Sequence, residues 1–170
     1  MQRTREDWVK AGLQRLAEAG IHEVRVEPLA RALQISKGSF YHYFKDRKEL
    51  LDAMIDYWES DATTRILREL EKEHFTLEQL FELTIHQNKS MEAAVYEWAR
   101  QDPAVASRLE AIEEQRMNGI SLLYQRKGLP PSEAKDRARL VYFTYVGWIV
   151  RFKAYAHVDA KKLFKLLLAL

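Results

Sequence analysis

The stretch from Lys37 to His42 combines the side-chain chemistries that bind a nucleic acid. Lys37 is a cation, Ser39 and Tyr41 carry hydroxyls, and Gly38 leaves its backbone uncovered. Cationic and hydrogen-bonding groups at the exposed start of a helix suit the approach to a polyanion. We therefore expect this stretch to contact DNA, with Lys37 reaching a guanine edge or a phosphate.

Three further cations follow, at Lys45, Arg47 and Lys48. We expect them to bind backbone phosphates, which would make the affinity salt-dependent. The alternative for Lys45 and Lys48 is that they are ordinary solvated charges. Glu27 opposes phosphate binding, so it either accepts a hydrogen bond from cytosine or caps a helix.

The elements that position these side chains lie within residues 26–44. A first short helix carries Leu29, Ala30 and Leu33 on one face, and the chain breaks at residues 34–36. Ser36 has the side chain of an N-cap for a second helix, which would begin at Lys37. Two short helices joined by a tight turn predict a helix-turn-helix unit, at about residues 25–44.

Within the second helix, the period of the apolar residues divides its two faces. Phe40, Tyr43 and Phe44 are expected to face the core, which turns Tyr41 and His42 outward. A half-buried packing role for Tyr41 is the alternative.

Helical patterns flank this unit on both sides. An amphipathic helix is expected from Thr4 to Gly20, with Gly20 as its stop. Asp46 would cap a long helix over residues 47–73. Further helices are predicted over residues 77–91, 92–101, 103–128 and 133–155, with a last one after Asp159. The Thr76 and Gln79 pair forms a capping box, and Asp102 with Pro103 starts the following helix.

Composition excludes several classes of protein. The chain has 170 residues, no Cys, and 47% hydrophobic residues, which favours a compact, mostly helical protein with a real core. Its net charge is +2, divided into +3 over residues 1–50, −8 over 51–125 and +7 over 126–170. A basic head suits a phosphate-binding module, although each charged run could also be a solvated helix face. No signal peptide or membrane-length apolar run is visible, so we expect a cytoplasmic protein.

The residue pattern contains no motif that indicates catalysis. The five histidines show no metal-ligand spacing, and no nucleophile triad or Gly-rich phosphate loop is present. The neighbouring Glu113 and Glu114 resemble exposed charges rather than an acid/base pair. We expect no enzyme activity, no cofactor and no metal site.

The segment from Arg3 to about Trp58 resembles the N-terminal DNA-binding domain of the TetR family of transcriptional regulators. The residues that carry the resemblance are AEAGI (17–21), LARAL (29–33) and ISKGSFYHYFKDRKELL (35–51). It covers about a third of the chain. It implies that Tyr41 and His42 contact phosphate or a thymine methyl, and that a helical body binds a small effector and dimerises through its last two long helices.

Two positions depart from that family pattern. Arg25 and Val26 stand where Thr commonly opens the first motif helix, and Gln34 stands where the turn commonly carries Gly. Gln34 must therefore adopt the turn conformation at some cost in strain.

The C-terminal helices predict a dimer. Residues 140–156 have few polar positions on any face, and a helix that is apolar all round is buried on more than one side. Gly147 would be tolerated there for close helix packing. An intersubunit helical bundle would bury these helices, so we expect a homodimer.

An effector site is expected among large or polar groups on the body helices. Arg151 could pair with an anionic effector, although pairing with a body carboxylate such as Glu97 is favoured. Aromatic stripes are also more often core or interface than a ligand site. The candidates are His86, Trp98, Tyr124, Tyr145, Trp148 and Arg151.

Together these features predict an all-α protein of about nine helices. Residues 1–48 would form a three-helix DNA-binding head, and residues 49–170 a larger effector-binding and dimerisation body. The leading hypothesis is a ligand-responsive regulator that binds a pseudo-palindromic double-stranded operator, most simply a repressor released by a small molecule. The alternative is a helical sensing or assembly protein whose basic head binds a protein partner.

Overall fold

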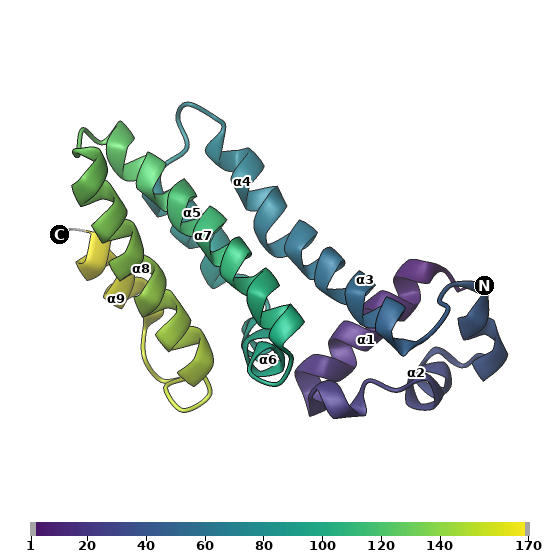
Figure 1. Cartoon of the computed structure of the whole chain (residues 1–170). Helices are drawn as coiled ribbons and strands as arrows, with labels where there is room; N and C mark the ends of the chain where they lie inside the picture. The colour runs from purple at the N-terminus through teal and green to yellow at the C-terminus, as the bar shows by residue number, and fades with distance from the viewer. Residues whose placement is uncertain (1–2, 169–170) are drawn as a thin grey trace. The chain divides into compact units, whose positions relative to one another are not determined.

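The computed structural model describes residues 3–168, and the regular secondary structure of these residues is all helical, as Figure 1 shows. Helical turns at η1 (Ile21–Glu23), η2 (Lys37–His42) and η3 (Ser60–Thr64) accompany the α-helices. The α-helices are α1 Arg5–Ala19, α2 Val26–Leu33, α3 Arg47–Glu59, α4 Arg65–Leu70, α5 Leu77–Ile85, α6 Lys89–Ala99, α7 Pro103–Arg126, α8 Pro131–Arg151 and α9 Ala160–Leu168. The predicted all-α fold with about nine helices is confirmed for the described residues.

The chain forms two compact units. The head unit comprises the residues up to Ser60 together with Ser90–Ala106, and the body unit comprises Asp61–Lys89 together with the residues from Ser107 onward. This division differs from the predicted boundary after residue 48, because all of α3 groups with the preceding helices and α6 joins them. The functional roles assigned to the two parts stay predictions.

The core of the head unit forms where α1 packs against α2 and α3. Trp8, Leu16 and Leu50 are fully buried there. Gly12 allows α1 and α3 to approach closely, since a Cβ at this position would lie 2.6 Å from Sδ of Met54. Burial of large side chains of this kind contributes about 1.5–3 kcal/mol each, so this small core can hold the head together.

Local capping signals fix several helix ends, and those at Gly20, Thr76 and Asp102 are as predicted. Thr4 and Asp7 form a capping box at α1, and Gly20 ends that helix with φ +83°. Thr76 and Gln79 form the predicted capping box at α5. Asp102 accepts hydrogen bonds from the first backbone N–H groups of α7, including that of Ala104 at 3.0 Å.

Four predicted helices have different bounds in the structure. The expected helix over residues 47–73 is interrupted by the π-helical turn η3, in which Ala62 and Thr63 are buried. The expected helix over residues 77–91 ends at Ile85, and α6 begins earlier than expected, at Lys89. The expected helix over residues 133–155 runs instead from Pro131 to Arg151.

The body unit has its own core. Phe81 of α5 stacks on Phe164 of α9, with ring centroids 4.5 Å apart. Gly119 of α7 lies against α4, where an added Cβ would come within 2.4 Å of Leu70. These two contacts join α5 to α9 and α7 to α4 in this core.

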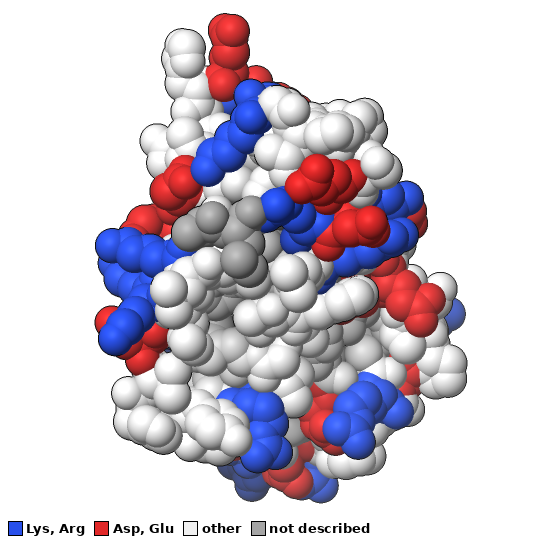
Figure 2. Space-filling model, turned by 90° about the vertical axis from the view of Figure 1, so that its left-hand side faces the viewer, with Lys and Arg blue, Asp and Glu red and all other residues white. Residues whose placement is uncertain are grey.

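Helix α8 is only half covered by the described chain. Tyr142 and Ile149 are buried, whereas Phe143 is 63% exposed and Leu140 and Val150 are about half exposed. Burial on more than one side, as expected from the sequence, is therefore not achieved within one chain. Figure 2 views the molecule from the side of α8 and α9 and shows uncharged residues across the middle of this face, with Lys, Arg, Asp and Glu around them. None of the described helices has the length and apolarity needed to cross a membrane.

Candidate DNA-binding surface

The turn between α2 and η2 is held by an unusual backbone conformation. Gln34 adopts the left-handed conformation, with φ 59° and ψ 44°, and ends α2. The N–H of Ile35 then donates to the carbonyl of Ala30 at 3.0 Å. A left-handed residue other than Gly costs roughly 1–2 kcal/mol, so the strain predicted for Gln34 is present.

The segment that follows is a 3₁₀-helix rather than the α-helix expected from the sequence. It covers only Lys37–His42, and the Ser36 side chain caps no backbone N–H, so the predicted N-cap role of Ser36 is wrong. The carbonyl of Ser36 instead accepts from the N–H of Ser39 at 3.1 Å and from its hydroxyl at 2.8 Å. These short-range bonds tighten the first turn and replace the cap.

Aromatic packing sets the orientation of this segment. Phe40 and Phe44 are fully buried and stacked, with centroids 5.3 Å apart, and Trp8 meets Phe40 edge-on at 5.2 Å. The Tyr43 hydroxyl donates to the carbonyl of Arg3 at 2.6 Å. The predicted inward face is therefore confirmed.

The opposite face of the same segment is open to solvent. Tyr41 is 58% exposed, and Lys37, Gly38 and His42 are exposed as well, while Ser39 is half-buried by its own hydrogen bond. Gly38 has no neighbouring atom closer to its would-be Cβ than the Ser36 hydroxyl at 3.8 Å. The backbone at this position can accordingly approach a flat surface.

Lys37 does not stand alone on this face. Its ammonium forms a short ion pair with the carboxylate of Glu27, which projects from the first turn of α2. The hydrogen bond from Lys37 lowers the pKa of Glu27, and the bond to Glu27 raises the pKa of Lys37. Because both side chains are about half exposed, a phosphate could compete for Lys37.

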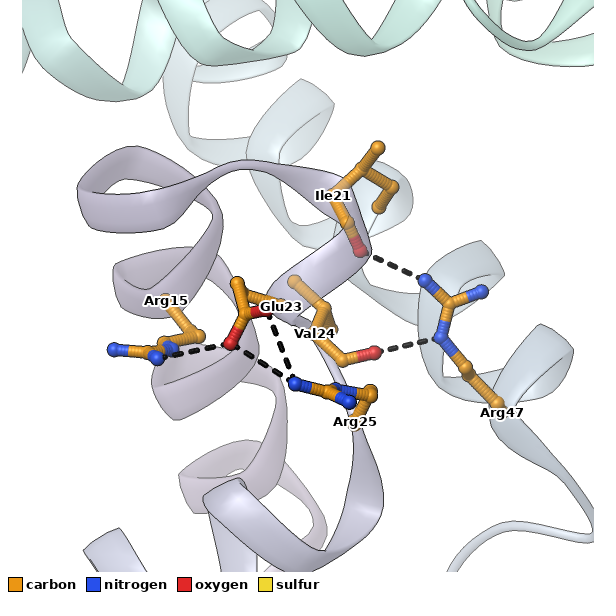
Figure 3. Close-up of polar contacts among 6 residues, drawn as sticks. All are labelled: Arg15, Ile21, Glu23, Val24, Arg25 and Arg47. Atoms are coloured by element: carbon orange, nitrogen blue, oxygen red, sulfur yellow. Dashed lines mark hydrogen bonds and ion pairs between the residues drawn. The ribbon is translucent and has the colours of Figure 1, made fainter.

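Arg47 is placed differently from the expectation that it binds phosphate. Its Nε donates to the carbonyl of Val24 at 2.6 Å and its Nη2 to the carbonyl of Ile21 at 2.8 Å, as Figure 3 shows. These two carbonyls belong to η1 and its end, so Arg47 ties the start of α3 to the connector before α2. We therefore regard Arg47 as a residue that positions the motif.

A second cluster in Figure 3 involves the position where the sequence departs from the family pattern. Arg25 donates to both carboxylate oxygens of Glu23, at 3.0 and 3.2 Å, and Arg15 donates to the same carboxylate at 3.1 Å. The hydrogen bond from Arg25, followed by that from Arg15, lowers the pKa of Glu23. Arg25 thus joins the entrance of α2 to α1.

The remaining predicted phosphate contacts are exposed cations. Lys48 pairs with Asp52 one turn along α3 at 2.8 Å, which raises the pKa of Lys48. The backbone N–H of Lys45 donates to Glu49 at 2.7 Å, and its side chain is exposed. Both ammonium groups lie next to the start of α3, where Asp46 accepts from the Glu49 N–H.

The body unit contains a cavity of about 70 Å³, lined mostly by apolar side chains. Among the six residues predicted for an effector site, Tyr145 lines it. Arg116 and Gln87 line it too, although sequence reasoning did not single them out. A signal for Arg116 was available, because it lies one helical turn from the buried Ile112 and Ile120 on the apolar stripe of α7.

The other predicted effector residues lie outside this cavity lining. His86 is exposed, 3.7 Å from Glu82, and Arg151 is exposed with its guanidinium over the Tyr155 ring. Glu97, considered as a partner for Arg151, pairs with Arg100 at 3.7 Å.

The three remaining aromatic candidates pack within their own units. Trp98 is buried in the head unit, and Tyr124 is buried in α7, where desolvation raises its pKa. Trp148 lies edge-on to Phe164 with centroids 6.2 Å apart. Across residues 3–168, no three His, Asp or Glu side chains are grouped as metal ligands.

The head unit contains the part of the chain that matches a known protein family. Residues 9–54 match the model of the family described as "Bacterial regulatory proteins, tetR family". The chain is 36% identical over 52 residues to the transcriptional regulator AcuR of Cereibacter sphaeroides, covering 31% of this chain and 24% of that protein. It is 32% identical over 89 residues to the nucleoid occlusion factor SlmA of Haemophilus ducreyi, covering 52% of this chain and 40% of that protein. The chain thus spans less than half the length of these curated relatives.

Solved structures resemble the chain over almost its whole length. A TetR-like transcriptional regulator from Rhodococcus sp. RHA1 superposes with a TM-score of 0.76 at 17% identity, covering 98% of this chain and 95% of that one. BioQ with its double-stranded DNA operator gives a TM-score of 0.53 at 19% identity, covering 99% and 97%. At these identities the likeness concerns the fold.

Proposed function

We propose that this chain, a member of the TetR family of bacterial regulatory proteins, is a cytoplasmic transcriptional regulator that reads double-stranded DNA with the outward face of residues 37–42. The observation that carries this proposal is the division of that segment. Phe40 and Phe44 are buried, while Lys37, Tyr41 and His42 remain exposed beside Gly38. The similarity of the fold to BioQ, which was solved on its operator, supports the same use of the head.

Each side chain of this face has a defined task in the proposal. Lys37 leaves Glu27 and donates to a guanine edge or a phosphate, and Ser39 reinforces the backbone close to the groove. Tyr41 and His42 contact phosphate or a thymine methyl. Lys45 and Lys48 add phosphate contacts that do not depend on sequence.

The active form would be a homodimer built on α8. Leu140, Phe143, Gly147 and Val150 are exposed and recur at intervals of three and four residues. This spacing places them on one stripe of the helix, as in a helix–helix seam. An added Cβ at Gly147 would meet no atom within 4 Å, so this glycine lets a second copy of α8 come close.

Two copies of the head would then bind a pseudo-palindromic operator in successive major grooves, about 34–36 Å apart. We propose that a small molecule in the body favours one arrangement of the heads over the other, and that its binding releases the operator. Repression is the simplest sign of regulation for this arrangement. The alternative is a head that binds a protein partner.

Titration of the full chain against genomic duplex fragments, followed by competition with unrelated duplex, tests the proposal. We expect Lys37→Ala and Tyr41→Ala each to weaken selected DNA on the order of tenfold, since each removes a groove contact. Lys135→Ala, which removes an exposed cation from α8, is the matched control and should bind normally. Unchanged DNA binding in both head variants, or binding insensitive to salt, would contradict the proposal.

A further inference from the structure

The cavity of the body unit has a lining that restricts what can occupy it. It lies between α4, α5, α7, α8 and α9, and its walls are formed chiefly by Leu, Ile, Phe and Tyr side chains such as Leu77, Phe81 and Tyr145. Cavities of about 150 Å³ hold a benzene molecule. At about 70 Å³ this cavity accepts only a short apolar group of a few carbon atoms.

The side-chain amide of Gln87 is a polar donor in this lining. Nε2 of Gln87 is buried and makes no hydrogen bond to any of the described residues. Gln87 follows the end of α5, where its own N–H donates to the carbonyl of Thr84 at 3.2 Å, so its backbone is fixed. A buried donor without an acceptor is destabilising, because its lost hydration is not replaced. An occupant that supplies an acceptor would remove this cost.

The charge at the cavity points to the same chemistry. Among the described residues that line the cavity, only Arg116 of α7 is charged, and none is a carboxylate. Its Nε donates to the hydroxyl of Thr63 at 2.9 Å, and Thr63 is buried in the π-helical turn η3. This bond fixes the guanidinium at the wall. An arginine carries N–H donors and no acceptor, so this part of the wall does not complement a cation.

We propose that the body cavity binds a short-chain monocarboxylate, whose apolar chain lies among the leucine and phenylalanine side chains and whose carboxylate accepts from Gln87 and faces Arg116. The identification of this molecule as the effector rests on the proposed function. Its binding to the cavity does not, because it requires neither DNA nor a second copy of the head.

A matched set of probes tests the class of ligand. Butanoate, 1-butanol and the butylammonium ion have the same chain and differ in the charge and hydrogen bonding of one end. We expect butanoate to bind the full chain with a millimolar dissociation constant in NMR titrations without DNA, shifting resonances of residues that line the cavity. Butanol should bind at least about fivefold more weakly and butylammonium not detectably. Equal binding of all three probes, or shifts confined to surface lysines, would overturn the proposal.

A single substitution isolates the donor. Gln87→Leu keeps a side chain of similar size and removes the amide, so affinity for butanoate should fall about tenfold while affinity for butanol stays equal or rises. Gln101→Leu, which removes an exposed amide from the head unit, should leave both affinities unchanged. The ratio of the two affinities is insensitive to any general loss of stability. An unchanged ratio in Gln87→Leu would overturn the role of Gln87.

DNA binding is measured separately, so the two proposals can fail independently. If butanoate binds as expected but leaves DNA affinity unchanged, the ligand class stands and its role as effector fails. If DNA affinity in the absence of ligand is already insensitive to Lys37→Ala and Tyr41→Ala, the proposed function fails whatever the cavity binds.

Discussion

Residues 37–44 of the head, which we propose to contact DNA, and helix α8 of the body both bury aromatic residues on one face, but their outer faces differ. In residues 37–44, Phe40 and Phe44 are buried and the outward residues are polar or amphipathic. In α8, Tyr142 and Ile149 are buried, yet the outward stripe with Phe143 is apolar as well. The polar groups on the outer face of residues 37–44 can hydrogen-bond to water. Helix α8 instead exposes an apolar stripe that a partner helix would cover. The outer face of residues 37–44 therefore suits contact with water, whereas that of α8 suits contact with a second helix.

The largest expected change in stability comes from the buried face of residues 37–44. Phe40→Ala should lower the free energy of unfolding by about 3–5 kcal/mol, because it removes the ring that packs between Trp8 and Phe44. Tyr41→Ala, one residue away and exposed, should change it by no more than about 0.5 kcal/mol. Urea denaturation followed by circular dichroism measures both. Similar losses in the two variants would show that the two faces are not separated.

The next test concerns the exposed side of α8. Phe143→Glu places a charge on the apolar stripe, so analytical ultracentrifugation should show a shift from dimer to monomer with little change in helix content. Lys135→Glu, an exposed substitution on the same helix, serves as the control and should remain dimeric. A dimer that survives Phe143→Glu would place the interface elsewhere.

A smaller loss is expected from the residue that positions the motif. Arg47→Met removes the hydrogen bonds to the carbonyls of Ile21 and Val24, and should cost about 1–3 kcal/mol in the free energy of unfolding. Lys48→Met breaks only an exposed pair with Asp52 and should cost about 0.5 kcal/mol or less. Thermal denaturation of both variants distinguishes a structural role for Arg47 from a purely phosphate-binding one. If Arg47→Met is as stable as Lys48→Met, the structural role of Arg47 is wrong and the phosphate-binding role is favoured.

The smallest effect should come from the ion pair between Lys37 and Glu27 on the proposed DNA-binding face. Glu27→Gln frees Lys37, so affinity for a random-sequence duplex at low salt should rise about threefold, with a salt dependence steeper by up to about one charge. Glu18→Gln removes a carboxylate from α1 and is the matched control. Fluorescence anisotropy across a salt series measures both variants. Weaker binding by Glu27→Gln would mean that Glu27 itself holds Lys37 in the binding position.

What could be predicted from the sequence was encoded in neighbouring residues. The capping residues Thr76 and Asp46 each lie three positions from their partners, and Gln34 occupies a turn that needs a left-handed residue. These relations are local, so the residue types reveal them. The inward face of residues 37–44 was equally visible, because Phe40 and Phe44 recur with a helical period.

What could not be predicted depends on contacts between distant segments. Arg47 looks like any other surface cation until η1, more than twenty residues earlier, brings two carbonyls to it. The π-helical turn at Ser60–Thr64 was hidden because Ala62, four residues from both Trp58 and Ile66, continues the apolar pattern of the helices on either side. The cavity has no motif at all, since Gln87 and Arg116 meet there only when separate helices pack.

In the proposed complex with DNA, the shortness of the 3₁₀ segment would limit how many base pairs one head could read. Its six residues span about 12 Å at roughly 2 Å per residue, the length of about three to four base pairs. Two heads would then specify about seven base pairs, a combination that occurs by chance about once in ten thousand positions. A genome offers about a million or more competing positions, so about seven base pairs would not define a single site. The distance between the half-sites and the ease with which the DNA bends would have to contribute to the specificity as well.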